Sequence, residues 1–229
     1  MKIVIQCAAT KVLDAGYMMG SSGKRVLFVA HPEKAPSGGG FVLARPDDVA
    51  MNGKTWRELL LDYNERTDNP LALRAAYQLY KDRTYQILVD AYGIHDVFIL
   101  SAGWGLIRAS FLTPVYDITF SNSAEDYKRR SRRDQYDDLC MLPWDANDDV
   151  VFFGGKDYLP LFCRLTHKYQ GRRHIFYNST KSKPEAPGCN LILYPTSTRT
   201  NWHYSCTKDF ITGKINIHGA RDVPKQRSG

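Results

Sequence analysis

The sequence lacks long hydrophobic runs, and this absence limits the class of protein. None of its 229 residues belongs to a run of eighteen apolar residues, and the amino terminus has no basic segment followed by a long hydrophobic one. A membrane-spanning helix needs the first pattern and a secretory signal needs the second. We therefore expect a soluble, cytoplasmic protein without a membrane partner.

Paired cysteines and long glycine-rich nucleotide motifs are also missing. The five cysteines are widely spaced and form no C-x-x-C pair, which argues against a disulfide framework and a structural zinc site. The pair Gly154-Gly155 follows a strand-like segment, but it is too short for a dinucleotide fingerprint or a P-loop. We expect reduced, mostly buried thiols, no metal and no cofactor, NAD and ATP included.

What the chain does have is enough apolar sequence for a core and an excess of basic residues. Hydrophobic residues make up 43% of the sequence, and 31 Lys and Arg oppose 24 Asp and Glu, for a net charge of +7. This excess favours a polyanion such as nucleic acid as partner, although many soluble enzymes are equally basic. We expect a single α/β domain over residues 1–218, with a loop-rich insertion at 12–55 and a disordered basic tail at 219–229.

Short apolar runs predict the strands of a central sheet. They are too short for helices and are rich in β-branched and aromatic residues, as buried strands are. Five such runs lie at residues 2–6, 97–100, 149–153, 174–177 and 191–194. A further strand-like run, at residues 25–30, lies within the expected insertion.

Two helices are predicted before the central strand at 97–100. The first covers residues 55–63, where Thr55 and Glu58 have the spacing of a capping box. The second covers residues 71–92, whose apolar side chains recur near helical spacing and whose stop signal is Gly93.

A third predicted helix would carry the densest group of cations in the chain. Ser123 is expected to cap it, and Asp126 three residues later gives an acidic variant of the capping box. Its cations are Lys128, Arg129, Arg130, Arg132 and Arg133. On a helix beside the site they would contact a nucleic-acid backbone, and an ordinary solvated face explains them equally well.

The segment from Asp96 to Phe120 carries the main site prediction. Its strand runs into the turn Ser101–Gly105, where small residues let the backbone approach a ligand closely. Ligands of α/β sheets gather at the carboxyl ends of strands, which is where this turn should lie. Tyr116 and Asp117 follow a proline-stiffened corner and would overlook the same pocket. The alternative is an ordinary strand exit in which Asp117 only caps a turn.

Other strand ends offer groups that suit an anion. Thr10 and Lys11 follow the first strand, although Lys11 is equally well explained as a solvated surface lysine. Gly154 and Gly155 precede a helix expected from residue 156 or 157 to 169, and a glycine pair before a helix N-terminus favours anion binding.

A polar and aromatic segment at residues 198–206 offers groups for a base or a sugar. It contains Asn201, Trp202, His203 and Tyr204. A lone histidine beside a tryptophan is more often part of the packing than a catalyst, so both interpretations of His203 stay open.

Three motifs along the chain, taken in order, carry a resemblance to a known family. They are Ile5–Lys11 (IQCAATK), Leu100–Ile107 (LSAGWGLI) followed by Pro114–Asp117 (PVYD), and Phe153–Gly155 (FGG) with Tyr158. Together they resemble the YaaA-like group of small α/β proteins, over roughly residues 1–170. The resemblance implies a uracil-DNA-glycosylase-like fold, which is a three-layer α/β/α sandwich around a mostly parallel sheet.

The resemblance also implies a function. The group includes proteins tied to DNA damage and oxidative stress, its wider fold includes base-excising enzymes, and it has been linked to phage defence through removal of modified bases. The GQDPYH-type loop that activates water in the glycosylase families is absent here. Asp117 is the position to which the resemblance carries the catalytic role.

We therefore expect a DNA glycosylase that flips out a modified or damaged base, such as hydroxymethylated or glucosylated cytosine, and leaves an abasic site. Its partner would be phage or damaged DNA, with no obligate protein partner. Asp117 would be catalytic, and the base would contact Ser101, Gly103, Trp104, Gly105, Tyr116, Gly154, Gly155, Tyr158, Asn201 and His203. The DNA backbone would contact Thr10, Lys11, Lys128, Arg129, Arg130, Arg132 and Arg133. The alternatives are a non-catalytic DNA-binding stress protein and a nucleoside or nucleotide hydrolase or transferase.

Overall fold

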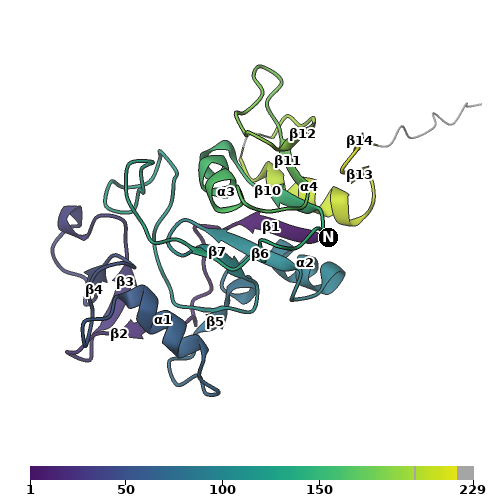
Figure 1. Cartoon of the computed structure of the whole chain (residues 1–229). Coiled ribbons are helices and arrows are strands. Elements are labelled where there is room, and N and C mark those ends of the chain that lie inside the picture. The colour runs from purple at the N-terminus through teal and green to yellow at the C-terminus, as the bar shows by residue number, and fades with distance from the viewer. Residues whose placement is uncertain (199, 221–229) are drawn as a thin grey trace, which may run out of the picture.

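A seven-stranded sheet forms the centre of the structure, a computed structural model that describes residues 1–198 and 200–220. The strand order across the sheet is β12-β11-β10-β1-β6-β7-β9 (Figure 1). The strands are β1 (Lys2–Gln6), β6 (Val97–Ser101), β7 (Gly105–Arg108), β9 (Leu139–Cys140), β10 (Val150–Phe153), β11 (Arg173–Tyr177) and β12 (Asn190–Leu193). All five predicted sheet strands are confirmed, and the fold class is mixed α/β, as expected.

The order in which the chain adds parallel strands to this sheet reverses between β1 and β10. Strands β6, β1, β10, β11 and β12 run parallel to one another, so their chain order across the sheet reads 2-1-3-4-5. Strand β7 runs antiparallel to its neighbour β6, and β9 pairs parallel to β7, so both run opposite to the other five strands. A crevice opens where the order reverses, because the connections leave β1 and β10 in opposite directions.

Helices cover both faces of the sheet. Neighbouring residues of a strand point to opposite faces, and in β10 the ring of Phe152 stacks on Phe162 of α3 (Leu159–Leu165) while Phe153 meets Phe210 of α4 (Trp202–Ile211). Helix α2 (Thr84–Tyr92) packs beside α4. The three layers follow from these contacts, and the unbroken burial of β6 and β10 reflects them.

The predicted insertion at residues 12–55 has a small sheet of its own. Strands β2 (Met18–Met19), β3 (Arg25–Phe28) and β4 (Val42–Ala44) form it, with the 3-10 turn η1 (Pro32–Lys34) between the last two. Helix α1 (Trp56–Asn64) follows, and Figure 1 shows these elements grouped at the end of the molecule away from α4. The Asp117 amide donates to the Phe28 carbonyl at 2.7 Å, which ties the insertion to the central segment.

The helix predicted over residues 71–92 is wrong in its first half. Only Thr84–Tyr92 is α-helical, because Arg74–Ala75 (β5) pairs with Leu112–Thr113 (β8) and Ala76–Gln78 forms the 3-10 turn η2. Ala72 also has a left-handed backbone, with φ at 50°. Pairing with distant segments therefore overrides the local helical spacing.

The basic helix predicted after Ser123 is absent from the described chain. Residues 123–133 form turns, and the Thr119 amide donates to the Lys128 carbonyl at 3.0 Å while the Arg130 amide donates to the Thr119 carbonyl at 2.8 Å. These long-range backbone bonds replace the helical ones, so the five cations do not share a helix.

The end of the chain differs in part from the expected disordered tail. Gly219–Ala220 forms strand β14, which pairs antiparallel with β13 (Ile215–Asn216). Residues 221–229 lie outside the described part of the chain. No described helix is long and apolar enough to cross a membrane.

Candidate functional site

The main pocket lies at the reversal of strand order, beside the carboxyl ends of β1 and β10. Its volume is about 710 Å³. Three segments that are distant in sequence supply most of its wall: the end of β1 with the loop that follows, the 3-10 turn η3 (Lys156–Tyr158), and the first turn of α4. The lining residues are Gln6, Cys7, Ala8, Ala9, Thr10, Lys81, Asp82, Thr119, Ser121, Gly155, Asp157, Tyr158, Thr200, Asn201, Trp202, His203 and Tyr204.

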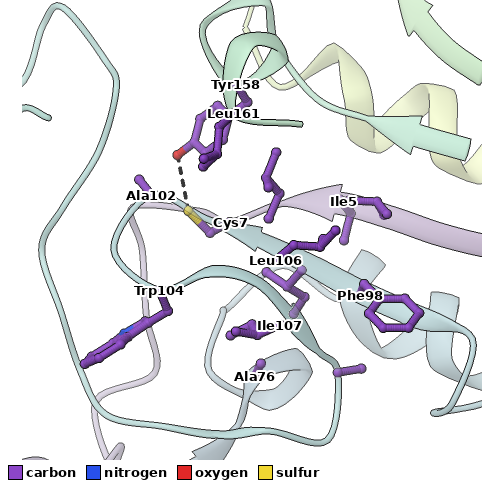
Figure 2. Close-up of a cluster of buried hydrophobic side chains, with 14 of the residues drawn as sticks. Ile5, Cys7, Ala76, Phe98, Ala102, Trp104, Leu106, Ile107, Tyr158 and Leu161 are labelled. Carbon is purple, nitrogen blue, oxygen red and sulfur yellow. Dashed lines mark hydrogen bonds between the residues drawn. The ribbon is translucent and has the colours of Figure 1, made fainter. Parts of the chain in front are cut away.

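Hydrogen bonds join the end of β1 and the residue after it to the segment that follows β10, where both line this pocket. The Gly155 amide donates to Oε1 of Gln6 at 2.6 Å, so the glycine turn is held against the end of β1. The Cys7 thiol and the Tyr158 hydroxyl lie 3.2 Å apart, and Figure 2 shows their side chains pointing toward each other. Burial raises the pKa of Tyr158 well above its usual value, so the phenol is neutral at pH 7.

Two carboxylates and one lysine stand in the wall of the main pocket. Asp82 precedes α2, and its Oδ1 accepts the Thr84 amide at 2.8 Å, which fixes the orientation of the carboxylate. Asp157 comes from η3, and the exposed Lys81 lies next to Asp82 in sequence. The pocket therefore combines groups that can orient a water molecule with a cation that can contact a phosphate.

His203 lies in the wall of the same pocket and is buried, with an exposed fraction of 3%. Burial lowers its pKa to about 4, against an opposing effect of Asp82, so the imidazole is neutral at pH 7. Among the described residues, Nε2 has no hydrogen-bond partner. Together with Asn201, His203 is one of the predicted substrate-binding residues that the structure does bring into the pocket.

The predicted floor of the site, Ser101–Gly105, is instead part of the core. The Ser101 hydroxyl accepts the amides of Gly103 and Trp104 at 3.2 and 3.1 Å, and the carbonyls of the same two residues accept hydrogen bonds from the buried Arg57. Gly105 has φ at 91°, and a Cβ there would lie 2.4 Å from the Leu139 carbonyl oxygen. These backbone groups are occupied, and none of the residues lines the main pocket.

Both aromatic rings proposed to stack on a base are buried. Trp104 has an exposed fraction of 0% and meets Phe28 edge to face, and Tyr116 has an exposed fraction of 1%. The Tyr116 hydroxyl accepts from Ser101 at 2.9 Å and lies 2.8 Å from the Tyr80 hydroxyl. Figure 2 shows Trp104 pointing away from Cys7 and Tyr158. In this structure neither ring offers a free face to a nucleobase.

Asp117 lies outside the main pocket, in a neighbouring hollow of about 240 Å³. Its Oδ2 is 2.9 Å from Nζ of Lys128, and the carboxylates of Glu125 and Asp117 raise the pKa of that lysine. Lys11 lines the same hollow, where its ammonium sits 4.3 Å from the centre of the Tyr116 ring. Ala9 is the residue that borders both spaces. The structure thus brings Asp117, Lys11, Lys128 and Tyr116 together, apart from the predicted residues that line the main pocket.

Of the remaining cations of the basic run, two line a groove, one is buried and one is partly exposed. Arg132 and Arg133 are exposed and line a groove of about 480 Å³, which shares Asp157 with the main pocket. In the described chain no carboxylate pairs with either of them.

Arg130 and Arg129 are less available for the predicted contact with a DNA backbone than Arg132 and Arg133 are. The Arg130 guanidinium is buried, binds both carboxylate oxygens of Asp138 at 2.8 and 2.6 Å, and donates to the Ala102 carbonyl at 2.7 Å. It is therefore a structural residue. Arg129 is partly exposed and pairs with Asp126 at 2.5 Å.

A further space, of about 700 Å³, opens at the carboxyl ends of β10, β11 and β12. It shares Gly155, Asp157 and Trp202 with the main pocket, and Gly154 also belongs to its wall. Its wall is rich in hydroxyl groups, which come from Ser179, Thr180, Ser182, Thr196, Ser197 and Thr198.

Sequence reasoning missed Lys81 and Asp82, because the predicted helix over residues 71–92 placed them in its middle. The signal that could have located them is Asp82 itself, since an aspartate that can accept the amide two or three residues later is a common helix start signal. Gln6 and Cys7 were also missed as pocket residues. The residues that were predicted and do line the pocket are Thr10, Gly155, Tyr158, Asn201, Trp202, His203 and Tyr204.

Comparison with known proteins gave no match: no family model, no curated protein and no solved structure is significantly similar to this chain.

Proposed function

We propose that this protein is a DNA glycosylase, and that it hydrolyses the N-glycosidic bond of a modified or damaged base held in the main pocket. The observation that carries the proposal is the pocket at the reversal of strand order, which contains the oriented carboxylate of Asp82 and meets an arginine-lined groove at Asp157. The resemblance of the three sequence motifs to the YaaA-like group, and through it to a uracil-DNA-glycosylase-like fold, belongs to the same proposal.

The arrangement of charge supports a nucleic-acid substrate. A glycosidic bond inside the duplex is inaccessible, so the nucleotide must be rotated out of the stack and the backbone on either side must be held. Arg132 and Arg133 are exposed in the groove that meets the main pocket at Asp157. Cations in that position would contact phosphates next to the flipped nucleotide, as a positively charged groove does in other proteins that bind single strands.

Asp82 is the carboxylate to which we assign catalysis. As the C1′–N bond breaks, its electron pair leaves with the base, which takes up a proton, and positive charge develops on the sugar. A carboxylate stabilises that charge and accepts a proton from the water whose oxygen bonds to C1′. Asp82 lines the pocket, and the Thr84 amide holds its Oδ1, which leaves the other oxygen available to a water molecule. Asp117 is the less suitable candidate, because it borders another hollow and pairs with Lys128.

The neighbouring hydroxyl-rich space favours an enlarged base over an ordinary one. It adjoins the main pocket through Gly155, Asp157 and Trp202, so a substituent on the base has room beyond the pocket. Hydroxyl and amide groups hydrogen-bond well to a hydroxymethyl or glycosyl substituent. We therefore include hydroxymethylated and glucosylated cytosine, which occur in phage DNA, among the proposed substrates.

The test is release of bases from DNA, followed by alkali-induced strand breakage at abasic sites. Phage genomic DNA with hydroxymethylated or glucosylated cytosine would be compared with unmodified and uracil-containing DNA. We expect abasic sites in modified DNA, and Asp82→Asn should lower the rate by at least ~100-fold, since a positioned acid or base contributes that much.

Two further variants separate the assignments. Asp68→Asn is the matched control, because Asp68 is an exposed residue paired with Arg66 and outside the pocket, and it should retain the parent rate. Asp117→Asn tests the assignment made from sequence. A loss with Asp117→Asn and none with Asp82→Asn would reverse our choice of carboxylate, and absence of abasic sites on every DNA would refute the glycosylase.

A further inference from the structure

Two cysteines from different elements of the fold lie in contact. Cys163 belongs to α3 and Cys189 directly precedes β12, and the side chains are hydrogen-bonded to each other. Both residues are partly exposed, whereas Cys7 and Cys206 are buried. A small molecule in solution therefore has access to two thiols that are already adjacent.

The side chain of Arg173 joins the two segments that carry these thiols. Its Nη2 donates to the Pro187 carbonyl at 3.0 Å, and its Nη1 lies 3.4 Å from the hydroxyl oxygen of Thr166 at the end of α3. Thr166 lies three residues after Cys163 and so close to the same face of the helix. The thiol of Cys189 lies 3.7 Å from the same Pro187 carbonyl oxygen. One guanidinium thus holds the end of α3 against the segment before β12.

The two thiols of this pair differ in acidity. The hydrogen bond from Cys163 lowers the pKa of Cys189 to about 7, and the charge of Arg173 acts in the same direction, against the effect of partial burial. The same hydrogen bond raises the pKa of Cys163. Cys189 is therefore about half thiolate at pH 7, and the thiolate is the form that attacks a disulfide.

From these contacts we propose that Cys163 and Cys189 are a redox-sensitive pair, which a low-molecular-weight disulfide such as oxidised glutathione converts into an intramolecular disulfide. Neither cysteine lines the main pocket, so the inference does not rest on the proposed function.

The reaction takes place in two exchange steps. The Cys189 thiolate attacks one sulfur of oxidised glutathione, whose S–S bond breaks, and the products are a mixed disulfide and one glutathione thiolate. Cys163 gives its proton to that thiolate and attacks the Cys189 sulfur. The second glutathione then leaves as a thiolate and takes up from solvent the proton that Cys189 had lost. Two thiols of the protein are oxidised, and one glutathione disulfide is reduced to two thiols.

The test treats the full chain, reduced and then freed of reductant, with oxidised glutathione and maps the products by mass spectrometry of non-reduced peptides. We expect a bond between Cys163 and Cys189, loss of two of the five free thiols, and their recovery with dithiothreitol. The rate should rise with pH and level off above about 7, because it follows the Cys189 thiolate. An ordinary thiol would level off only above about 8.5.

Cys163→Ser should stop at the mixed disulfide on Cys189, because no second thiol remains to displace the glutathione. Cys140→Ser is the matched control, since Cys140 is exposed and its thiol donates to the Leu165 carbonyl at 3.2 Å, and it should form the bond as the parent does. Circular dichroism before treatment shows that each variant is folded.

The mapped bond in the parent decides the outcome, whatever the variants do. Five free thiols after treatment, glutathione left on both Cys163 and Cys189, or a bond that involves Cys140 would overturn the proposal. A bond between Cys163 and Cys189 in a protein that releases no base would support the pair and refute only the glycosylase.

Discussion

Trp104 is a core residue, and its role can be tested by its contribution to stability. Its indole is fully buried and meets Phe28 and Tyr116 edge to face, while its carbonyl accepts a hydrogen bond from Arg57. Trp104→Ala should therefore lower the free energy of unfolding by about 3–5 kcal/mol, as large-to-small changes of buried aromatic residues do. The measurement is urea unfolding followed by circular dichroism.

Trp144→Ala is the matched control, because Trp144 is 65% exposed. That variant should stay within about 0.5 kcal/mol of the parent, as surface substitutions usually do. If Trp104→Ala unfolded like the parent but lost DNA binding, the stacking role expected from sequence would be right and the core role wrong.

Individual site residues were predictable where they follow a strand of the sheet directly. Thr10, Gly155 and Tyr158 were found in this way, because ligands gather at the carboxyl ends of parallel strands and the apolar runs locate those ends. Ser101–Gly105 satisfied the same rule and is still buried. There the chain turns back at once into β7, so the carboxyl end of β6 is covered by its own hairpin and by Arg57.

Thr55 begins α1 with a complete capping box, an element-scale feature that the sequence predicted correctly. Its hydroxyl accepts the Glu58 amide at 3.2 Å, and its own amide donates to the Glu58 carboxylate at 2.7 Å. Thr55→Ala should lower the free energy of unfolding by about 1 kcal/mol, because the Glu58 amide in the first turn of the helix loses its acceptor. Urea unfolding of the parent and the variant measures the difference.

Ser123→Ala is the informative counterpart, since the sequence also predicted a helix cap there. In the structure no helix follows Ser123, and its exposed hydroxyl lies 2.8 Å from that of Ser121. We expect a change within about 0.5 kcal/mol. A cost equal to that of Thr55→Ala would instead favour the basic helix.

Strands were predicted more reliably than helices here, for a physical reason. The strands of the central sheet are covered on both faces, so their apolar runs are continuous and easily recognised. The two wrong helix predictions lie where short segments pair with distant ones: β5 with β8, and Thr119 with Arg129. Such pairing depends on contacts between segments, which local spacing does not encode. Lys81 and Asp82 were missed for this reason alone.

At the scale of the whole molecule, the pocket is a product of topology rather than of any one motif. Residues 6–10, 155–158 and 200–204 meet because β1 and β10 are neighbours in the sheet and α4 starts beside them. The side chains that connect these segments include buried tyrosines: the Tyr85 hydroxyl donates to the Gln6 carbonyl at 2.8 Å, and Tyr158 contacts Cys7. Because these tyrosines are buried, the stability of the fold should vary with pH in the alkaline range.

Four tyrosines, Tyr80, Tyr85, Tyr116 and Tyr158, have their pKa values raised well above the usual value, in each case mainly by burial. Each keeps its proton in the folded protein and releases it on unfolding once the pH exceeds ~10, the value for an unfolded chain. Below that pH both states hold the proton and these groups add no pH dependence; above it the unfolded state binds fewer protons, so stability falls as pH rises.

We expect the free energy of unfolding to fall with a limiting slope of about 1.4 kcal/mol per pH unit for each of the four tyrosines. The absorbance of their tyrosinate forms should then appear together with the loss of helical circular dichroism. Tyr85→Phe should reduce the slope by the share of one tyrosine, because phenylalanine cannot ionise. If all four phenols ionised at a lower pH than the one at which the helical signal is lost, they would not be buried in the folded protein as the structure has them.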